Sequence, residues 1–205
     1  MEILKTSFAV AVLFFTISAN AQTFEDTHKA FKASYTNEDK GNYSAAIADL
    51  QKVYQADSYE INLRLGWLHY ANKEHEKSMG YYQKAIDLRK YSTEARFGYI
   101  KPANEAKQYV KAYNKYEEIL KIDPYNSVAN YWVGVNYYNI KKYDVAATYL
   151  ELVVNMNPFD YDGNYLLGWA YLNLGKSNDA KLLFQKCLLY KPDDTNAKDG
   201  LSKCK

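Results

Sequence analysis

Residues Tyr161 to Pro192 read YDGNYLLGWAYLNLGKSNDAKLLFQKCLLYKP, and the spacing of their small and apolar residues recurs along the chain. Moving the frame back by 34 residues finds the pattern three more times without a slip. The matched positions are Leu167, Gly168, Tyr171, Ala180, Phe184 and Pro192; Val133, Gly134, Tyr137, Ala146, Leu150 and Pro158; Tyr99, Ile100, Ala112, Tyr116 and Pro124; and Leu65, Gly66, His69, Ser78, Tyr82 and Ala85. Such a period indicates an internal structural repeat.

Each copy of the pattern predicts two helices. In residues 164–174 the apolar and small residues follow the i, i+3, i+4, i+7 spacing of one helical face. Gly168 removes a side chain from that face, so a second helix, over about residues 178–190, can approach closely. Gly175 suits the turn between them, and Pro192 ends the second helix. One such hairpin cannot bury its own apolar face, so stability must come from stacking on its neighbours.

The order L-G-x-x-Y, then A-x-x-x-F, then P, with a period of 34 residues, closely resembles the tetratricopeptide repeat (TPR) family. The resemblance implies an all-α fold, a right-handed α-solenoid of stacked helix-turn-helix hairpins. We expect one domain over residues 22–205, with repeats at about 59–92, 93–126, 127–160 and 161–194. A divergent repeat at about 23–58, with helices over about 24–35 and 43–55, precedes them, and a polar capping helix over 195–203 follows.

The start of the chain is typical of a secretory signal peptide. Lys5 gives a positive beginning, residues 8–17 form a short apolar run, and Ala19-Asn20-Ala21 fits a cleavage site. The run is too short to span a bilayer. We therefore expect residues 1–21 to be removed, leaving a periplasmic or secreted protein of a Gram-negative bacterium without a stable membrane anchor. The alternative is a short N-terminal anchor that is retained.

Composition and motifs point away from several classes of function. The 205-residue chain has a net charge of +2, without the concentrated basic face that a nucleic-acid partner requires. His28, His69 and His75 fall at different repeat positions without metal-ligand spacing, and His69 is expected to be a packed core residue. Nucleotide-binding and nucleophile motifs do not occur. We expect no catalytic residue, no metal and no cofactor, and hence no enzyme.

The two cysteines, Cys187 and Cys204, leave one question open. An oxidising compartment permits a disulfide between them. Cys187, however, occupies a small buried position of its helix, and sequence alone does not supply the required geometry.

The resemblance also implies a binding groove, because the first helices of TPR hairpins line a concave surface. The residues expected there are Leu63, Arg64, Trp67, Tyr70, Phe97, Lys101, Tyr131, Trp132, Tyr138, Tyr165, Trp169 and Asn173. All three tryptophans of the chain are in this set. The tryptophan position of the family pattern is instead occupied by Asn62, Arg96, Asn130 and Asn164, which weakens the packing within each hairpin unless tyrosines compensate.

Two interpretations of the aromatic residues remain open. Large rings at helical spacing can simply pack between adjacent helices. Alternatively, they form an open groove that holds a peptide or protein segment, since Tyr and Trp are favoured at binding hot spots. The second interpretation predicts a non-catalytic adaptor or scaffold in the bacterial envelope. A glycan-binding module that uses the same rings is the alternative function.

Overall fold

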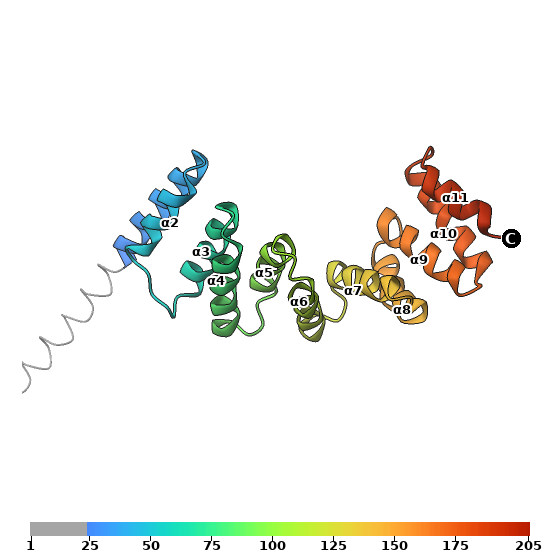
Figure 1. Cartoon of the computed structure of the whole chain (residues 1–205), viewed down its shortest axis with the longest axis horizontal. Helices are drawn as coiled ribbons and strands as arrows, with labels where there is room; N and C mark the ends of the chain where they lie inside the picture. Colours follow the sequence, from blue (N-terminus) through green and yellow to red (C-terminus); the bar gives the residue numbers. More distant parts are fainter. Residues whose placement is uncertain (1–23) are drawn as a thin grey trace, which may run out of the picture. The chain divides into compact units, whose positions relative to one another are not determined.

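The computed structural model describes residues 24–205, so the predicted signal peptide at residues 1–21 lies outside the described part of the chain. These residues form helices and no strand (Figure 1). An N-terminal helix, described over residues 24–39, is followed by α2 (Tyr43–Gln51), α3 (Tyr59–Ala71), α4 (His75–Leu88), α5 (Thr93–Glu105), α6 (Tyr109–Ile122), α7 (Ser127–Asn139), α8 (Tyr143–Met156), α9 (Tyr161–Asn173), α10 (Ser177–Tyr190) and α11 (Thr195–Lys203). Within residues 24–205, no helix has the length and apolarity needed to cross a bilayer.

Hairpins stack on one another within two compact units, the first ending at Ala106 and the second beginning at Lys107. In the first unit α3 packs against α4, and α4 against α5. In the second unit the same succession runs from α7 through α8, α9 and α10 to α11. The predicted fold class, an all-α solenoid of helical hairpins, is confirmed.

A polar side chain fixes the start of α3, α5, α7, α9 and α11. The N-cap residue accepts a hydrogen bond from the backbone N–H three residues later, which satisfies one of the free donors of the first turn. These pairs are Ser58 with Ile61 (3.3 Å), Ser92 with Ala95 (3.0 Å), Asn126 with Ala129 (3.1 Å), Asp160 with Gly163 (2.7 Å) and Asp194 with Ala197 (2.7 Å). With Asp160 as its N-cap, α9 begins at Tyr161, the expected first residue of its repeat.

The turn inside each hairpin uses a left-handed residue, and in three repeats this residue is a lysine. Gly175 has a φ of +75°, as its position in the sequence predicted. Lys73, Lys107 and Lys141, at the equivalent positions, have φ values of 62°, 57° and 61°. A side chain with a Cβ is strained in this region, whereas glycine is not.

The core of two repeats is an aromatic ring held between two glycines. A Cβ added to Gly168 would lie 3.0 Å from the ring of Phe184, and one added to Gly200 would lie 2.5 Å from it. Tyr82 lies in the same way between Gly66 and Gly98. The close helix approach predicted at the repeat glycine is thus present.

The divergent first repeat differs from its prediction. The N-terminal helix extends to residue 39 rather than ending near residue 35, because only a tight turn through Gly41, with a φ of +73°, separates it from α2. Helix α2 ends at Gln51, four residues before the predicted end.

The cysteines are free thiols in this structure. Cys187 is buried, as predicted, and its burial raises the pKa of the thiol to about 12, with a smaller contribution from the charge of Asp194. Cys204 lies in the turn that ends α11, where its Sγ contacts the Gly200 carbonyl at 3.3 Å.

Candidate functional site

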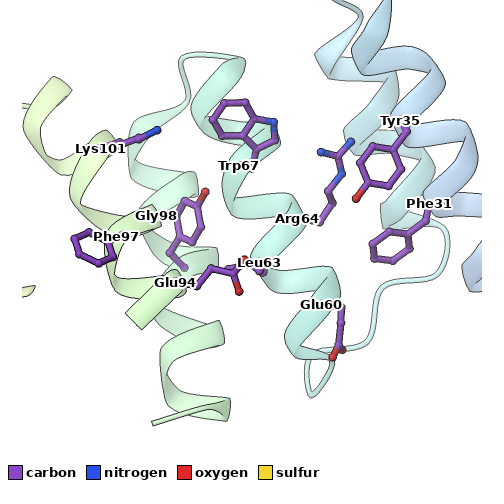
Figure 2. A pocket seen from close by; sticks show the side chains of 11 residues that line it. Phe31, Tyr35, Glu60, Leu63, Arg64, Trp67, Glu94, Phe97, Gly98 and Lys101 are labelled. Atoms are coloured by element: carbon purple, nitrogen blue, oxygen red, sulfur yellow. The ribbon is translucent and has the colours of Figure 1, made fainter. Parts of the chain in front are cut away.

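A cavity of 530 Å³ opens between the N-terminal helix, α3 and α5 in the first unit (Figure 2). Five of the predicted groove residues, Leu63, Arg64, Trp67, Phe97 and Lys101, line it. The other lining residues are Phe31, Tyr35, Glu60, Tyr82, Glu94 and Gly98. Most of these side chains are aromatic or aliphatic, so the interior of the cavity is apolar.

Equivalent positions of two helices form the two main walls. The α3 wall consists of residues 60, 63, 64 and 67, and the α5 wall of residues 94, 97, 98 and 101, which lie 34 positions later. Both sets follow the i, i+3, i+4, i+7 spacing of a single helical face. Each wall therefore begins with a glutamate, and the opposite end has Trp67 on α3 and Lys101 on α5. Figure 2 shows Trp67 and Lys101 at one end and Glu60 at the other.

The Tyr82 ring packs directly against Gly98, and both residues line the cavity. A Cβ at Gly98 would lie 2.2 Å from Tyr82 Cε1, so no other residue fits without moving the ring. The ring is largely buried, with 5% of the residue exposed, and its burial raises the pKa of the phenol. Later repeats have Trp132 and Leu166 where α5 has Gly98.

Glu38 of the N-terminal helix holds the side chains of one wall in place. Arg64 Nη2 donates a hydrogen bond to Glu38 Oε2, and Trp67 Nε1 donates one to Glu38 Oε1. The Arg64 guanidinium also lies over the Tyr35 ring, with Cζ 3.8 Å from the ring centroid. Burial alone would raise the pKa of Glu38, but the two hydrogen bonds and the positive charge of Arg64 hold it below its usual value. Sequence reasoning missed this glutamate, because it assigned residue 38 to a loop.

The free charges of the cavity lie at opposite ends. Glu60 and Glu94 are exposed, and neither forms an ion pair with any residue in the part of the chain described here. Glu94 Oε2 accepts a hydrogen bond of 3.0 Å from the Tyr59 hydroxyl. At the other end, Lys101 Nζ lies 5.9 Å from the centroid of the Trp67 ring, and 37% of Trp67 is exposed.

Tyr131 and Trp132 line a separate, smaller hollow of 290 Å³ in the second unit. The Trp132 ring stacks on Tyr116 with 6.1 Å between centroids and an interplanar angle of 18°, and 46% of the tryptophan is exposed. Tyr116 occupies the space beneath it, which directs the tryptophan outward. Burial, with the charges of Asp162 and Asp160 nearby, raises the pKa of Tyr131.

The third tryptophan is packed rather than open. Trp169 lies edge-on to Phe184 at 5.3 Å, and Lys203 of α11 lies over its ring at 5.1 Å. Its neighbour Tyr165 contacts the same Phe184 ring at 6.3 Å. The indole nitrogen of Trp169 is buried without a hydrogen-bond partner. The packing interpretation therefore holds at this tryptophan.

The three remaining predicted groove residues support their neighbours. Tyr70 packs against the Trp67 ring with 5.8 Å between centroids. Tyr138 is half-buried and packs edge-on against Tyr143 at 5.3 Å. The exposed Asn173 donates a hydrogen bond of 2.8 Å to the Trp169 carbonyl within its own helix.

Two family models, both described as tetratricopeptide repeat, match the chain over residues 36–95 and 161–194. Together with the stacked hairpins, these matches decide the family. The chain belongs to the tetratricopeptide repeat family. No curated protein matches its sequence significantly.

Solved TPR structures are similar to this TPR chain in fold. A TPR protein from Parabacteroides merdae has a TM-score of 0.72 at 17% identity, covering 88% of this chain and 72% of that one. MamA has a TM-score of 0.68 at 20% identity, with coverages of 82% and 93%. YrrB, described as a TPR protein with an unusual peptide-binding site, has a TM-score of 0.69 at 14% identity, with coverages of 91% and 97%.

The asparagines at the family's tryptophan position have a role that the sequence analysis missed. Asn130 Nδ2 donates hydrogen bonds to the carbonyls of Pro124 (2.9 Å) and Asn126 (3.0 Å), which belong to the turn before its own helix. Asn62 and Asn164 make the same pair of bonds to the carbonyls six and four residues earlier. At these three positions hydrogen bonds hold the helix to the turn before it, where the family pattern has a packed indole.

The histidine at a core position also behaves as its sequence context predicted. His69 is buried, its ring stacks on Tyr81 at 5.0 Å, and its Nδ1 lies 2.5 Å from Glu74 Oε2. Across residues 24–205, no group of three or more His, Cys, Asp or Glu side chains is arranged to hold a metal ion.

Proposed function

We propose that this TPR protein is a non-catalytic adaptor that holds a peptide or protein segment in the cavity between the N-terminal helix, α3 and α5. The observation that carries the proposal is the cavity of 530 Å³ lined by aromatic and aliphatic side chains, Trp67 among them. Rigid aromatic side chains offer a large contact area at a low entropic cost, which is the usual composition of a binding hot spot.

Pre-organisation of the cavity wall supports this proposal. The two hydrogen bonds to Glu38 orient Arg64 and Trp67 before any partner arrives. A partner then loses less free energy in ordering these side chains, so more of the contact energy appears as affinity. YrrB, a TPR protein of similar fold, has a peptide-binding site, which supports a peptide ligand for this chain.

The proposed setting is the bacterial envelope, and it rests on the signal-like residues 1–21. Cleavage after Ala21 leaves a protein that begins at Gln22 and is found in the periplasmic or extracellular fraction. Intact-mass measurement of the protein purified from its native host tests this setting. A cytoplasmic protein that retains residues 1–21 would contradict it.

A glycan is the second candidate ligand, and one observation favours it. Trp132 presents an exposed ring stacked on Tyr116, which is a flat platform of the kind on which sugar rings stack. Binding that an oligosaccharide competes, and that is lost in Trp132→Ala, would support this alternative over the adaptor.

The adaptor is tested with matched tryptophan variants. Trp67→Ala should abolish capture of a protein partner from envelope extracts, with little change in the far-UV circular dichroism spectrum. Trp132→Ala, a similarly exposed tryptophan in the other unit, is the control and should leave capture intact. Quenching of fluorescence by acrylamide should be greater for Trp67 than for the packed Trp169. Equal capture by wild type and Trp67→Ala would refute a site at this cavity.

A further inference from the structure

The cavity between α3 and α5 has a direction, because its unpaired charges are separated along the helices. Glu60 and Glu94 occupy the first turns of α3 and α5, and Lys101 lies near the end of α5. Seven residues of helix separate Glu94 from Lys101, a rise of about 10 Å. An extended peptide spans this length with about three residues.

Arg64 does not add to the positive end. Its guanidinium is bound to the Glu38 carboxylate and stacked on Tyr35, and only 10% of its side chain is exposed. A ligand carboxylate would have to displace Glu38 to reach it. The charges left for a ligand are therefore two carboxylates at one end and one ammonium group at the other.

From this arrangement we propose that the occupant is a peptide segment with a basic side chain at one end, an aromatic or aliphatic side chain in the middle, and an acidic side chain about three residues away. The basic group lies between Glu60 and Glu94. The apolar side chain enters the space lined by Leu63, Trp67 and Tyr82. The acidic group meets Lys101. This inference rests on the proposed adaptor function and specifies its ligand.

Helix electrostatics provides the competing explanation for the two glutamates. Acidic side chains in the first turn of a helix are favoured by the macrodipole whether or not a ligand exists. Asp162 occupies the same position in α9, at the same offset in the repeat, but does not line this cavity. It is therefore a matched control that shares the dipole effect and lacks the site.

The probes are three acetylated and amidated tetrapeptides, Arg-Phe-Leu-Glu, Gln-Phe-Leu-Gln and Glu-Phe-Leu-Glu. Each is titrated into the purified full chain labelled with nitrogen-15, and the indole N–H resonance of Trp67 is followed by NMR, which detects millimolar affinity. The Trp67→Phe variant assigns that resonance. We expect Arg-Phe-Leu-Glu to bind on the order of tenfold more tightly than Glu-Phe-Leu-Glu, because its arginine forms ion pairs with Glu60 and Glu94 where a glutamate is repelled, and we expect the difference to shrink at high salt.

The double variant Glu60→Gln with Glu94→Gln should remove the preference, whereas Asp162→Asn should preserve it. Glutamine keeps an oxygen that can accept the hydrogen bond from Tyr59, so the local structure is retained. Equal binding of the three peptides at Trp67 would overturn the charge assignment and leave the adaptor function standing. No shift of the Trp67 resonance with any peptide, together with unchanged partner capture by Trp67→Ala, would overturn both.

Discussion

Gly98→Leu should destabilise the protein strongly, and Tyr82→Leu should rescue it. A Cβ at Gly98 would lie 2.2 Å from Tyr82 Cε1 and 2.5 Å from Cζ, against ordinary contacts of 3.4–4 Å. The ring cannot retreat, because a Cβ at Gly66 on its other side would already lie 2.9 Å from it. The second unit contains the combination that fits, since Leu150 and Leu166 occupy the equivalent positions and belong to one core cluster.

The magnitudes follow from these contacts. Overpacking costs ~1–3 kcal/mol, and the clamped ring places Gly98→Leu at the upper end, about 3 kcal/mol. Replacing a glycine within a helix by leucine stabilises the helix by ~1 kcal/mol. The net decrease in the free energy of unfolding is therefore about 2 kcal/mol. Tyr82→Leu alone removes a ring that is 95% buried and leaves a cavity, at a cost of about 2 kcal/mol. The double variant should lie within about 1 kcal/mol of wild type, a coupling energy of about 3 kcal/mol.

The stabilities of wild type, the two single variants and the double variant are compared by thermal melting, monitored by circular dichroism. Each kcal/mol of stability shifts Tm by ~2–4 °C in a chain of this size. Gly80→Ala is the control, since Gly80 lies in α4 and an added Cβ meets nothing within 4 Å. It should raise Tm through helix propensity alone. A double variant that is less stable than either single variant, with the two losses simply added, would refute the packing described for Tyr82.

Three further predictions concern other repeats. Lys141→Gly should raise Tm. Removing the strain of a positive φ at a lysine stabilises the fold by ~1–2 kcal/mol, whereas the flexibility of glycine in the unfolded chain costs ~0.4–1 kcal/mol, and a lower Tm would contradict this. Asn130→Ala should cost about 2 kcal/mol in a urea titration, since it leaves two turn carbonyls without their donor, and an unchanged midpoint would exclude the assigned role. The pKa of Glu38 is lowered on folding, so its contribution to stability is complete above the usual glutamate pKa and is lost as the pH falls through the lowered value. Glu38→Gln should therefore flatten the acidic limb of the Tm profile, below about pH 5, and an unaltered limb would contradict the pKa direction.

The repeat period predicted most of the fold. The offsets of Gly168 and Phe184 indicated which helical faces meet, because a close approach requires a small residue opposite a large one. They do not explain why α3, α5, α7 and α9 begin at residues 59, 93, 127 and 161, the expected first residues of the repeats. That depends on the N-cap residues, such as Asp160, which lie outside the apolar pattern and act through a single hydrogen bond.

The predicted groove residues occupy corresponding faces of the first helices but differ in how far they are exposed. These residues occupy the same repeat positions in each first helix. How far a side chain is exposed depends on the neighbouring side chains that pack beneath it or over it. Trp132 points outward because Tyr116 fills the space under it, and Trp169 is covered by α11. The cavity lies where Gly98 stands in place of the Trp132 and Leu166 of later repeats, and Glu38 contacts the cavity wall from 26 residues before Arg64. The 34-residue sequence repeat predicts neither of these features.

The asparagines at residues 62, 130 and 164 each make the turn before their own helix self-contained. All the partners of Asn164 that hold the turn lie within residues 158–164, and the same seven-residue spacing surrounds Asn130. A 34-residue segment cut before successive prolines, such as residues 124–157, therefore carries its own hydrogen-bonded turn as well as its own two helices. Gene duplication within such a chain can lengthen or shorten it without any compensating change elsewhere, and the same cut sites are where a designer would insert or remove a unit to move the binding cavity along the molecule.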